Sequence, residues 1–554
     1  MKKWVFKNQT NLMIAGMLLL YILSVLINLG QLNLAGEEPK RALVSLEMMK
    51  SGDYVVPHAL GMLYYNKPPI FNWILVGMMK LTGSESEFVL RLPSLIFLLI
   101  WALCHYQICK NFFSKKIALL STFFMLTAGD LFFFALSNGT EIDVFYSFIV
   151  YLQAISLFWF AQQNRWWSFF IFSWLFCAVG FLTKGFPSVV FQGLTMIGIC
   201  IQAKSIKILF KPQQLIGVAL FGIIVGAYFY AYSLRQSPSG MWMNLIIESL
   251  KKTGAARESA GKLYKIATYP LLALKLLLPW ALLFLLLLKK QRFTFFDNPL
   301  VKFSFLFIVL NIGVYWFTGV PELRYIYMFT PFVMNIMVHL YDQFQQQNPG
   351  IIEKYLKYAA IIFFILLVGV IVLPFFYKEV IWQVVLIAGI LALFLFFFLK
   401  YKSYRLWLLI TGIILMRLTY AVVGIPVQMK GLIDYRNSMM AFAEKNNNRP
   451  LNFWQPVDTI NMDVVLAGKM IYKWKKDPVI VPSYLFYEVP YYYYRATGKL
   501  MKFDTAARSG QTYIAHQDRL MKHGITSFYA QYDRRQKDSV CLFRLPEDSI
   551  NVMY

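Results

Sequence analysis

The sequence predicts a polytopic α-helical membrane protein with about thirteen transmembrane helices and a small C-terminal α/β domain outside the cytoplasm. Three observations indicate this fold class. Of the 554 residues, 58% are hydrophobic and only 15% are charged, which is unusual for a soluble globular protein. Apolar runs of about 17 to 21 residues, each long enough to cross a bilayer, recur along most of the chain. After about residue 423 these runs stop, and turn-rich sequence with alternating apolar residues follows, as in "DPVIVPSYLF" and "SVCLFRL".

The first apolar run begins the topology. It follows Lys2, Lys3 and Lys7 and lacks a small-residue cleavage site, so we expect an uncleaved signal anchor with the N-terminus in the cytoplasm. Counted from that start, the short cytoplasmic connections are rich in lysine and arginine, as the positive-inside rule expects. The predicted segments are 11–29, 90–108, 117–136, 142–161, 167–183, 186–201, 213–232, 268–288, 300–318, 325–341, 357–376, 380–399 and 404–423.

The odd number of crossings places the tail on the far side of the membrane. We therefore expect a transmembrane domain over residues 1–423 and a soluble extracytoplasmic α/β domain over 424–554. Two long connections, 30–89 and 233–267, lie on the same side as the tail. These connections are expected to form the functional face.

The net charge of +26 does not indicate nucleic-acid binding, because the lysines and arginines fall mostly in short connections and no base-reading module is visible. The five cysteines have no spacing typical of a disulfide framework or a metal site.

Carboxylates stand at two predicted helix starts. Glu37 and Glu38 precede Pro39, and apolar residues then recur at helical spacing, which predicts an amphipathic helix along the outer membrane surface. Asp143, in "EIDVFYSF", begins the fourth transmembrane segment. Acids at such positions are functional candidates, although helix capping also places them there.

A lysine is held by prolines in the first outer connection. Lys67 precedes Pro68 and Pro69, which fix the local backbone, and it follows Tyr64 and Tyr65, which are typical interfacial aromatics. Its ammonium suits the phosphate of a lipid carrier. The alternative is a lysine that snorkels to ordinary headgroups.

Further cations lie on the same outer side. Lys184, in "FLTKGFP", opposes the positive-inside trend and therefore requires an anionic partner. Arg257 lies in a cation-rich stretch of the second outer connection, and Arg324 precedes Tyr325 at the tenth segment. Such a set attracts phosphate, and the plain alternative is contact with anionic lipid headgroups.

The motifs "GEEPKRA", "LEMMKSGDYVVP", "YYNKPP", "RLPS", "EIDVFYSF", "TKGFP" and "RYIYMFTP" resemble, in order and spacing, a known family. They are similar to the bacterial 4-amino-4-deoxy-L-arabinose (aminoarabinose) transferases of lipid A and their protein O-mannosyltransferase relatives. Both groups are C-type glycosyltransferases that use polyprenyl phosphate. The similarity is strong over about residues 10 to 100 and patchy afterwards. With thirteen segments and an outer tail, it implies the aminoarabinose branch, a bacterial inner-membrane location and a periplasmic tail.

The sequence departs from the family pattern at two positions. The family usually has an Asp-Glu pair where this chain has Glu37 and Glu38, so the first acid is one methylene longer. A family arginine is replaced by Lys40, which turns a bidentate phosphate contact into a point charge. Lys67 and Asp143 match their motif positions without change.

The resemblance implies inverting transfer of a sugar from undecaprenyl phosphate to an extracytoplasmic acceptor such as lipid A. Its catalytic carboxylates would be Glu37 and Glu38, with Asp143 in support, and a divalent metal on Glu37 and Asp143 stays open. The residues implied for the donor phosphate are Lys40, Arg41, Lys67, Lys184, Arg257, Arg324 and Tyr325.

Three other interpretations remain. The acceptor could be a protein or another envelope glycan, and membrane lipids are partners in every case. A transporter or flippase of lipid-linked sugars should show internal repeats, broken helices or charges at helix centres, and the sequence shows none of these plainly. A non-catalytic scaffold would not need the acids and cations together.

We predict that a reporter active only in the cytoplasm is silent when fused after Tyr554, because an odd number of crossings exports the tail. The measurement is reporter activity in intact cells, with the same reporter fused before Lys2 as the active control. An active C-terminal fusion would mean that the helix count is wrong by one.

Overall fold

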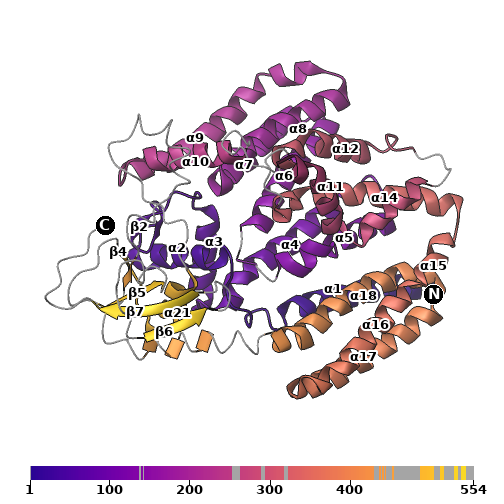
Figure 1. The fold of residues 1–554 in the computed structure, drawn as a ribbon. Coiled ribbons are helices and arrows are strands. Elements are labelled where there is room, and N and C mark those ends of the chain that lie inside the picture. Colours follow the sequence, from indigo (N-terminus) through magenta and orange to yellow (C-terminus); the bar gives the residue numbers. More distant parts are fainter. Residues whose placement is uncertain are drawn as a thin grey trace. The chain divides into compact units, whose positions relative to one another are not determined.

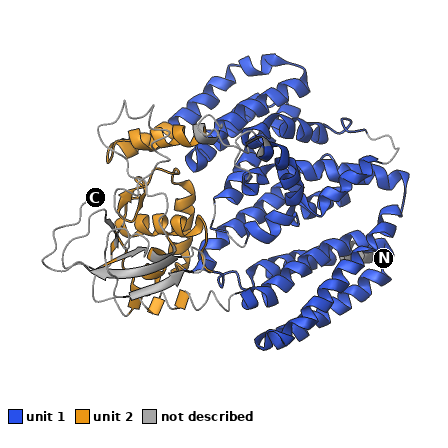
Figure 2. Cartoon of the chain, viewed as in Figure 1, with its two compact units in different colours: residues 1–32, 86–224, 259–430 blue, residues 33–85, 225–258, 431–554 orange. Residues whose placement is uncertain are grey.

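The computed structural model describes most of the chain, and its residues divide into two compact units, each described by itself (Figure 2). Unit 1 comprises 1–32, 86–224 and 259–430, and unit 2 comprises 33–85, 225–258 and 431–554. The described residues are 2–136, 139–140, 142–252, 262–288, 294–316, 322–428, 436–437, 440–441, 443–444, 452–454, 487–504, 512–516, 529–533 and 538–544.

Unit 1 is helical (Figure 1). Its α-helices are α1 (Lys2–Leu26), α4 (Glu87–Cys109), α5 (Lys115–Leu126), α6 (Asp143–Gln162), α7 (Trp166–Lys184), α8 (Pro187–Ala203), α9 (Gln213–Ser233, which continues into unit 2), α11 (Lys262–Leu277), α12 (Pro299–Asn311), α13 (Gly313–Trp316), α14 (Thr330–Gln347), α15 (Ile351–Leu356), α16 (Ala359–Val372), α17 (Ile381–Lys400) and α18 (Arg405–Thr419). Short 3₁₀ or π turns are η1 (Leu131–Ala135), η2 (Ile206–Phe210), η3 (Trp280–Leu288), η4 (Leu323–Phe329), η5 (Leu373–Phe375), η6 (Lys378–Val380), η7 (Lys402–Tyr404) and η8 (Tyr420–Gly424).

The helices make this a multi-pass membrane protein. Within the described residues, eight helices are long and apolar enough to cross a bilayer, or nine if the bent pair Ile266–Leu277 and Trp280–Leu288, 114° apart, is one span. Every predicted segment contains a helix or this bent pair. Some are short: the run 117–136 is interrupted because α5 ends at Leu126 and Asp130 follows. The count of thirteen crossings therefore stays a prediction.

The break in the bent pair lies against the end of α5. Gly129 donates its backbone N–H to the Leu278 carbonyl at 2.8 Å. A Cβ on Gly129 would approach that oxygen to 3.0 Å, so this close contact favours glycine. The adjacent Asp130 and the last turn of α11, with Lys275, are thereby fixed near each other.

Buried polar side chains join the helices of unit 1. His105 of α4 hydrogen-bonds to Ser121 of α5 at 2.9 Å, and Ser121 donates to the Asn335 side-chain oxygen of α14 at 3.0 Å. The Asn335 amide in turn donates to Ser304 of α12 at 3.2 Å. Such bonds between apolar helices fix their rotation and register, because a shifted helix would leave these groups unsatisfied in an apolar interior.

The "RLPS" motif anchors the segment before α6. Arg91 is 1% exposed and donates to the carbonyls of Leu29 and Leu32, each at 2.8 Å. Ser94 donates to the Gly139 carbonyl, and a Cβ on Gly139 would lie 3.0 Å from the Arg91 carbonyl oxygen. The start of α6 is therefore placed by backbone contacts with α4.

Unit 2 combines helices with two small sheets. Its elements are α2 (Glu38–Ser51), β1 (His58–Ala59), β2 (Met62–Leu63), α3 (Ile70–Thr82), α10 (Ser239–Lys252), β3 (Asn452–Trp454), α21 (Glu488–Thr497), β4 (Phe503–Asp504), β5 (Thr512–His516), β6 (Tyr529–Asp533) and β7 (Asp538–Arg544).

The tail contributes a five-stranded sheet in the order β4-β3-β5-β7-β6, of which β5, β6 and β7 are drawn in yellow in Figure 1. Strand β3 pairs in parallel with β4 and β5, whereas β7 pairs antiparallel with β5 and β6. The alternating sequence "SVCLFRL" falls in β7 up to Arg544, and "DPVIVPSYLF" lies outside the described residues. A separate extracytoplasmic domain over 424–554 stays a prediction.

The prediction of an amphipathic surface helix after Glu37 is wrong in one respect. A helix is present, but α2 is buried on nearly all sides, including Glu38, Arg41 and Glu47. It packs against α3, β1 and α21, and because α21 comes from the distant tail, the helical pattern could not indicate this burial.

Candidate active site

The predicted site residues lie in both units. In unit 2, the two acids at the start of α2 differ in environment. Glu37 has a side chain that is 36% exposed, and its carboxylate pairs with Lys40 at 2.8 Å and with Arg41 at 3.7 Å. Glu38 is fully buried and accepts the backbone N–H of Ala35 at 3.1 Å. Glu38 therefore closes the turn before the helix, and Glu37 is the acid that a substrate can reach.

The Arg41 side chain is buried inside unit 2. Its side chain is 2% exposed, and its guanidinium donates to the Tyr64 hydroxyl at 2.8 Å. Tyr64, predicted to lie at the membrane interface, is itself 6% exposed. Burial raises the pKa of Tyr64 above its ordinary value, so this hydroxyl stays neutral. The pair therefore packs α2 against the segment that leads to Lys67.

Lys67 is fixed from both sides. The preceding Tyr65 carbonyl accepts a hydrogen bond from Asn244 of α10 at 2.8 Å, and α3 begins directly after Pro69. Lys67 is 8% exposed. A lysine that reaches out to headgroups would be largely exposed, so this burial favours a fixed anion-binding cation over snorkelling.

In unit 1, Asp143 and Lys184 form a buried ion pair. Asp143 begins α6 and Lys184 ends α7, and the Lys184 Nζ lies 2.5 Å from Asp143 Oδ1. The same ammonium lies 4.3, 5.0 and 6.0 Å from the ring centroids of Tyr325, Tyr146 and Tyr315. The predicted need of Lys184 for an anionic partner is confirmed. Because its charge is already engaged, Lys184 is better suited to hold Asp143 than to bind a donor phosphate.

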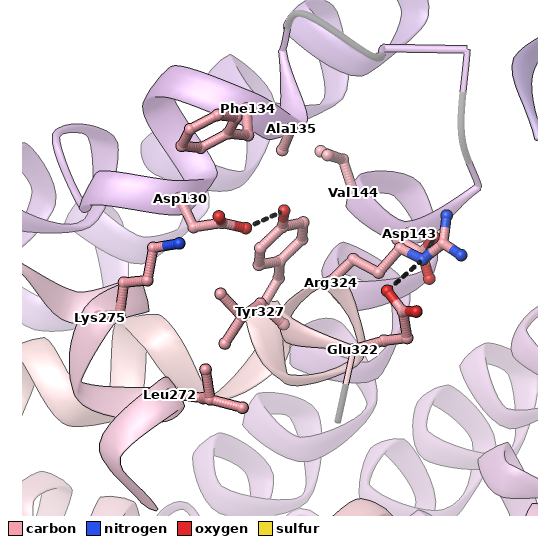
Figure 3. Close-up of a pocket in the computed structure, with 11 residues that line it drawn as sticks. Asp130, Phe134, Ala135, Asp143, Val144, Leu272, Lys275, Glu322, Arg324 and Tyr327 are labelled. Atoms are coloured by element: carbon pink, nitrogen blue, oxygen red, sulfur yellow. Dashed lines mark hydrogen bonds and ion pairs between the residues drawn. The ribbon is translucent and has the colours of Figure 1, made fainter. Parts of the chain in front are cut away.

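Arg324 extends this cluster toward a cavity (Figure 3). Its Nε lies 3.9 Å from Asp143 Oδ2 and 3.7 Å from Glu322 Oε2, and its side chain is 26% exposed. Its guanidinium carbon also lies 5.7 Å from the Tyr325 ring centroid. Asp143 is thus held by one buried cation and approached by a second that a ligand can reach.

The cavity has a volume of ≈ 470 Å³ and carries charges of both signs. Within it, the Tyr327 hydroxyl donates to Asp130 at 2.7 Å, and Lys275 points to the same acid (Figure 3). The lining residues are Asp130, Phe134, Ala135, Asp143, Val144, Leu272, Lys275, Glu322, Leu323, Arg324 and Tyr327.

Three of the charged residues here were missed by the sequence reasoning, which found no charges at helix centres: Asp130, Lys275 and Glu322. The signal was present for two of them. Asp130 interrupts the apolar run "FMLTAGDLFFF", and Lys275 interrupts "YPLLALKLLLP". An ionisable residue within an apolar segment marks a functional candidate by default.

Arg257 lies outside the described residues. A divalent metal on Glu37 and Asp143 stays open, but both carboxylates already have cationic partners. Across the described ranges, no three His, Cys, Asp or Glu side chains come together as a metal-binding group.

Comparison with known proteins supports the resemblance. The profile of the family described as dolichyl-phosphate-mannose-protein mannosyltransferase matches residues 66–230. The undecaprenyl phosphate-alpha-4-amino-4-deoxy-L-arabinose arabinosyl transferase of Photorhabdus laumondii is 25% identical over 227 residues, which are 40% of this chain and 40% of that protein. The transferase of the same description from Pseudomonas aeruginosa is 30% identical over 159 residues, 27% of this chain and 28% of its own. The chain thus aligns with less than half the length of these relatives.

Solved structures extend the similarity to the whole fold. The crystal structure of ArnT from Cupriavidus metallidurans bound to undecaprenyl phosphate matches with a TM-score of 0.65 and 16% identity, over 97% of this chain and 98% of its own. The apo structure of the same protein matches with a TM-score of 0.67. At this identity the likeness shows a shared fold. The resemblance predicted from the motifs is confirmed.

The Lys184 and Asp143 pair should be strongly coupled in stability. We predict that Lys184→Met or Asp143→Asn alone lowers the free energy of unfolding by about 3 to 5 kcal/mol, because each leaves a buried charge without its partner. The double variant should cost clearly less than the sum. Denaturant unfolding in detergent micelles measures the cycle.

The matched control is the Arg235 and Asp53 pair, which has the same 2.5 Å separation but side chains that are 48% and 25% exposed. Its coupling should be about 0 to 1 kcal/mol. Equal coupling in the two cycles would contradict a buried pair in unit 1.

Proposed function

We propose that the chain is an integral-membrane glycosyltransferase that moves a sugar from a polyprenyl phosphate carrier to an extracytoplasmic acceptor. The observation that carries the proposal is the cluster of Asp143, Lys184 and Arg324 on a charged cavity within an apolar helical unit. A chain that only crossed the membrane would not need such charges, because their burial is costly. The fold match to a protein whose structure holds undecaprenyl phosphate supports the same assignment.

Each unit offers one firmly held cation as a candidate for the donor phosphate. Lys67 of unit 2 is 8% exposed and lies on a backbone fixed by Asn244 and Pro69. Arg324 of unit 1 lines the cavity and retains 26% exposure of its side chain. A fixed cation stabilises the negative charge that grows on the phosphate as the sugar leaves, without reorganising during the reaction.

The acceptor proton is assigned to a carboxylate. The acceptor oxygen forms a new bond to the anomeric carbon, and the bond from that carbon to the phosphate oxygen breaks. The electron pair leaves with the polyprenyl phosphate, while the acceptor proton passes to Glu37. Glu37 is proposed for this step because its carboxylate is 36% exposed, whereas Glu38 is buried.

Asp143 supports the reaction as a fixed negative charge, and Lys184 is proposed as its positioning residue. The pair is enclosed by Tyr325 and Tyr146, which restrict the movement of the Lys184 ammonium. A carboxylate held in one rotamer keeps its geometry through the reaction.

The sugar, the acceptor and the membrane location are proposed from the similar proteins. The relatives' names support aminoarabinose as the sugar, and lipid A is the acceptor proposed with it. We further propose a location in a bacterial inner membrane, with about thirteen crossings, the N-terminus in the cytoplasm and the tail in the periplasm.

The bent pair of α11 and η3 favours one rival function. Broken helices are typical of transporters, and this one, with 114° between its parts, contributes Lys275 to the cavity. A flippase would move the lipid-linked sugar without breaking its bond to phosphate.

Mass spectrometry of lipids and envelope glycans from cells with and without the gene tests the proposed function. We expect an acceptor that gains the mass of one sugar residue only when the gene is present. If the lipid-linked sugar accumulates unchanged and no acceptor gains mass, transfer is excluded and the flippase remains.

We predict that Lys67→Ala weakens use of the lipid-linked donor, because the fixed ammonium no longer neutralises the phosphate. Initial rates over a range of donor concentrations measure the change, and Lys80→Ala, which removes an exposed lysine of unit 2, is the control. Unchanged turnover at limiting donor would show that Lys67 contacts only ordinary headgroups.

We predict that Glu37→Gln lowers the rate of transfer by about 10² to 10⁴, the usual effect of losing a positioned base, with little loss of donor binding. Glu37→Asp, which restores the acid usual in the similar family, should retain activity. A folded Glu37→Gln protein with near-normal turnover would make Glu37 a helix-terminal charge and pass the role of base to Asp143.

A further inference from the structure

Glu47 of α2 lies in the motif "LEMMKSGDYVVP", and the proposed reaction gives it no role. It is 6% exposed, and its two carboxylate oxygens accept the backbone N–H groups of Leu60 and Gly61, the latter at 3.0 Å. These two residues form the turn between β1 and β2, and both have a positive φ, 56° and 75°. Over the described part of the chain, Glu47 forms no ion pair. Its carboxylate therefore acts as a clamp on a turn that is unfavourable for leucine.

The clamped turn leads directly to Lys67. Strands β1 and β2 pair His58 with Leu63, and the Tyr64 N–H donates to the Pro57 carbonyl at 2.8 Å. Lys67 follows three residues after Tyr64. The position of the β1–β2 hairpin on α2 therefore sets where the segment 64–69, which contains Lys67, begins.

The other end of the segment is fixed to the same helix. Asn72, in the first turn of α3, donates to the Arg41 carbonyl at 3.2 Å and to the Ser45 hydroxyl at 3.0 Å. Residues 64–69 are thus bracketed by two attachments to α2. The hydrogen bond from Arg41 to the Tyr64 hydroxyl is a third attachment to α2, and of the three only the one through Glu47 depends on a carboxylate.

We propose that Glu47 is a positioning residue for Lys67, which acts by holding the β1–β2 turn on α2 and thereby setting the place of the donor-binding ammonium. The proposal rests on the proposed function, since it assumes that Lys67 binds the donor phosphate. Glu47 itself touches no substrate. Loss of its clamp should affect donor binding before it affects the chemical step.

The charge state of Glu47 makes this role depend on pH. Burial raises the pKa of Glu47 to about 7, although the N–H groups of Gly61 and Leu60 oppose the shift. Among the described residues, Tyr487 directly before α21 interacts electrostatically with Glu47, and the side chain of Lys502 lies next to Gly61. Protonation turns one acceptor oxygen into a donor, so one of the two N–H groups loses its partner.

A rise in pH changes the stability of the fold and the positioning of Lys67 in opposite directions. Because the folded pKa lies above the unfolded value of 4.5, the contribution of Glu47 to stability is fully present below pH 4.5 and is lost as the pH rises through about 7. The positioning of Lys67 instead improves as the pH rises, because both Glu47 oxygens accept a backbone N–H only when the carboxylate is ionised. Lys67 should therefore be held best above pH 7.

The test is binding of undecaprenyl phosphate to the full-length protein in nanodiscs, compared at pH 6 and pH 8. We expect Glu47→Gln to weaken binding at pH 8 about tenfold, the usual effect of losing a hydrogen bond to a charged group. The same change should be small at pH 6. The phosphate titrates equally in both proteins, so the difference between the two pH profiles reports Glu47. Glu87→Gln, which changes another buried glutamate, is the matched control and should bind as the unmodified protein does.

The Lys67→Ala variant separates failure of the positioning role of Glu47 from failure of the donor assignment of Lys67. If it weakens binding and Glu47→Gln does not, the positioning role is wrong and the donor assignment stands. If Lys67→Ala leaves binding unchanged, the assignment of Lys67 fails at the level of the proposed function.

If the Glu47→Gln protein does not insert into the membrane, hydrogen exchange of the unmodified protein gives a second measurement. After correction for intrinsic rates, amides of residues 58–67 should exchange faster at pH 6 than at pH 8. Equal protection at the two pH values would overturn the clamp.

Discussion

The ion pair between Lys184 and Asp143 is the interaction on which the candidate site depends. Two charges at 2.5 Å, both nearly inaccessible, are stable in an apolar unit only when each neutralises the other. Their pairing joins the start of α6 to the end of α7 and brings Tyr325 against the same ammonium. It also leaves Arg324, together with Lys275, as a cation that lines the cavity.

The acids of unit 2 also need groups that stabilise their charge, but Glu37 and Glu47 find different partners. Glu37 keeps both a cationic partner and contact with solvent, which suits an acid that exchanges protons with a substrate. Glu47 has no described cation and holds backbone N–H groups instead, so its charge depends on pH near neutrality. Local environment therefore gives carboxylates of one helix region separate roles in transfer and in positioning.

Sequence reasoning located the helices because apolar runs of bilayer length need no tertiary information. It also indicated the partner requirement of Lys184, since a cation on the outer side violates the topology trend. It could not place the bond between Tyr327 and Asp130, whose partners are 197 residues apart. The burial of α2 was missed for a related reason: α21, which covers part of it, comes from the tail. Contacts of this kind follow from how helices pack, which periodicity alone does not specify.

The central claim is that the bond between sugar and carrier phosphate is broken by this protein. The most direct measurement uses purified protein in liposomes that contain an undecaprenyl-phosphate-linked amino sugar and lipid A, with mass spectrometry of both lipids. The account predicts free undecaprenyl phosphate and lipid A heavier by one sugar residue in equal amounts. An intact lipid-linked sugar that has only changed leaflets would contradict it.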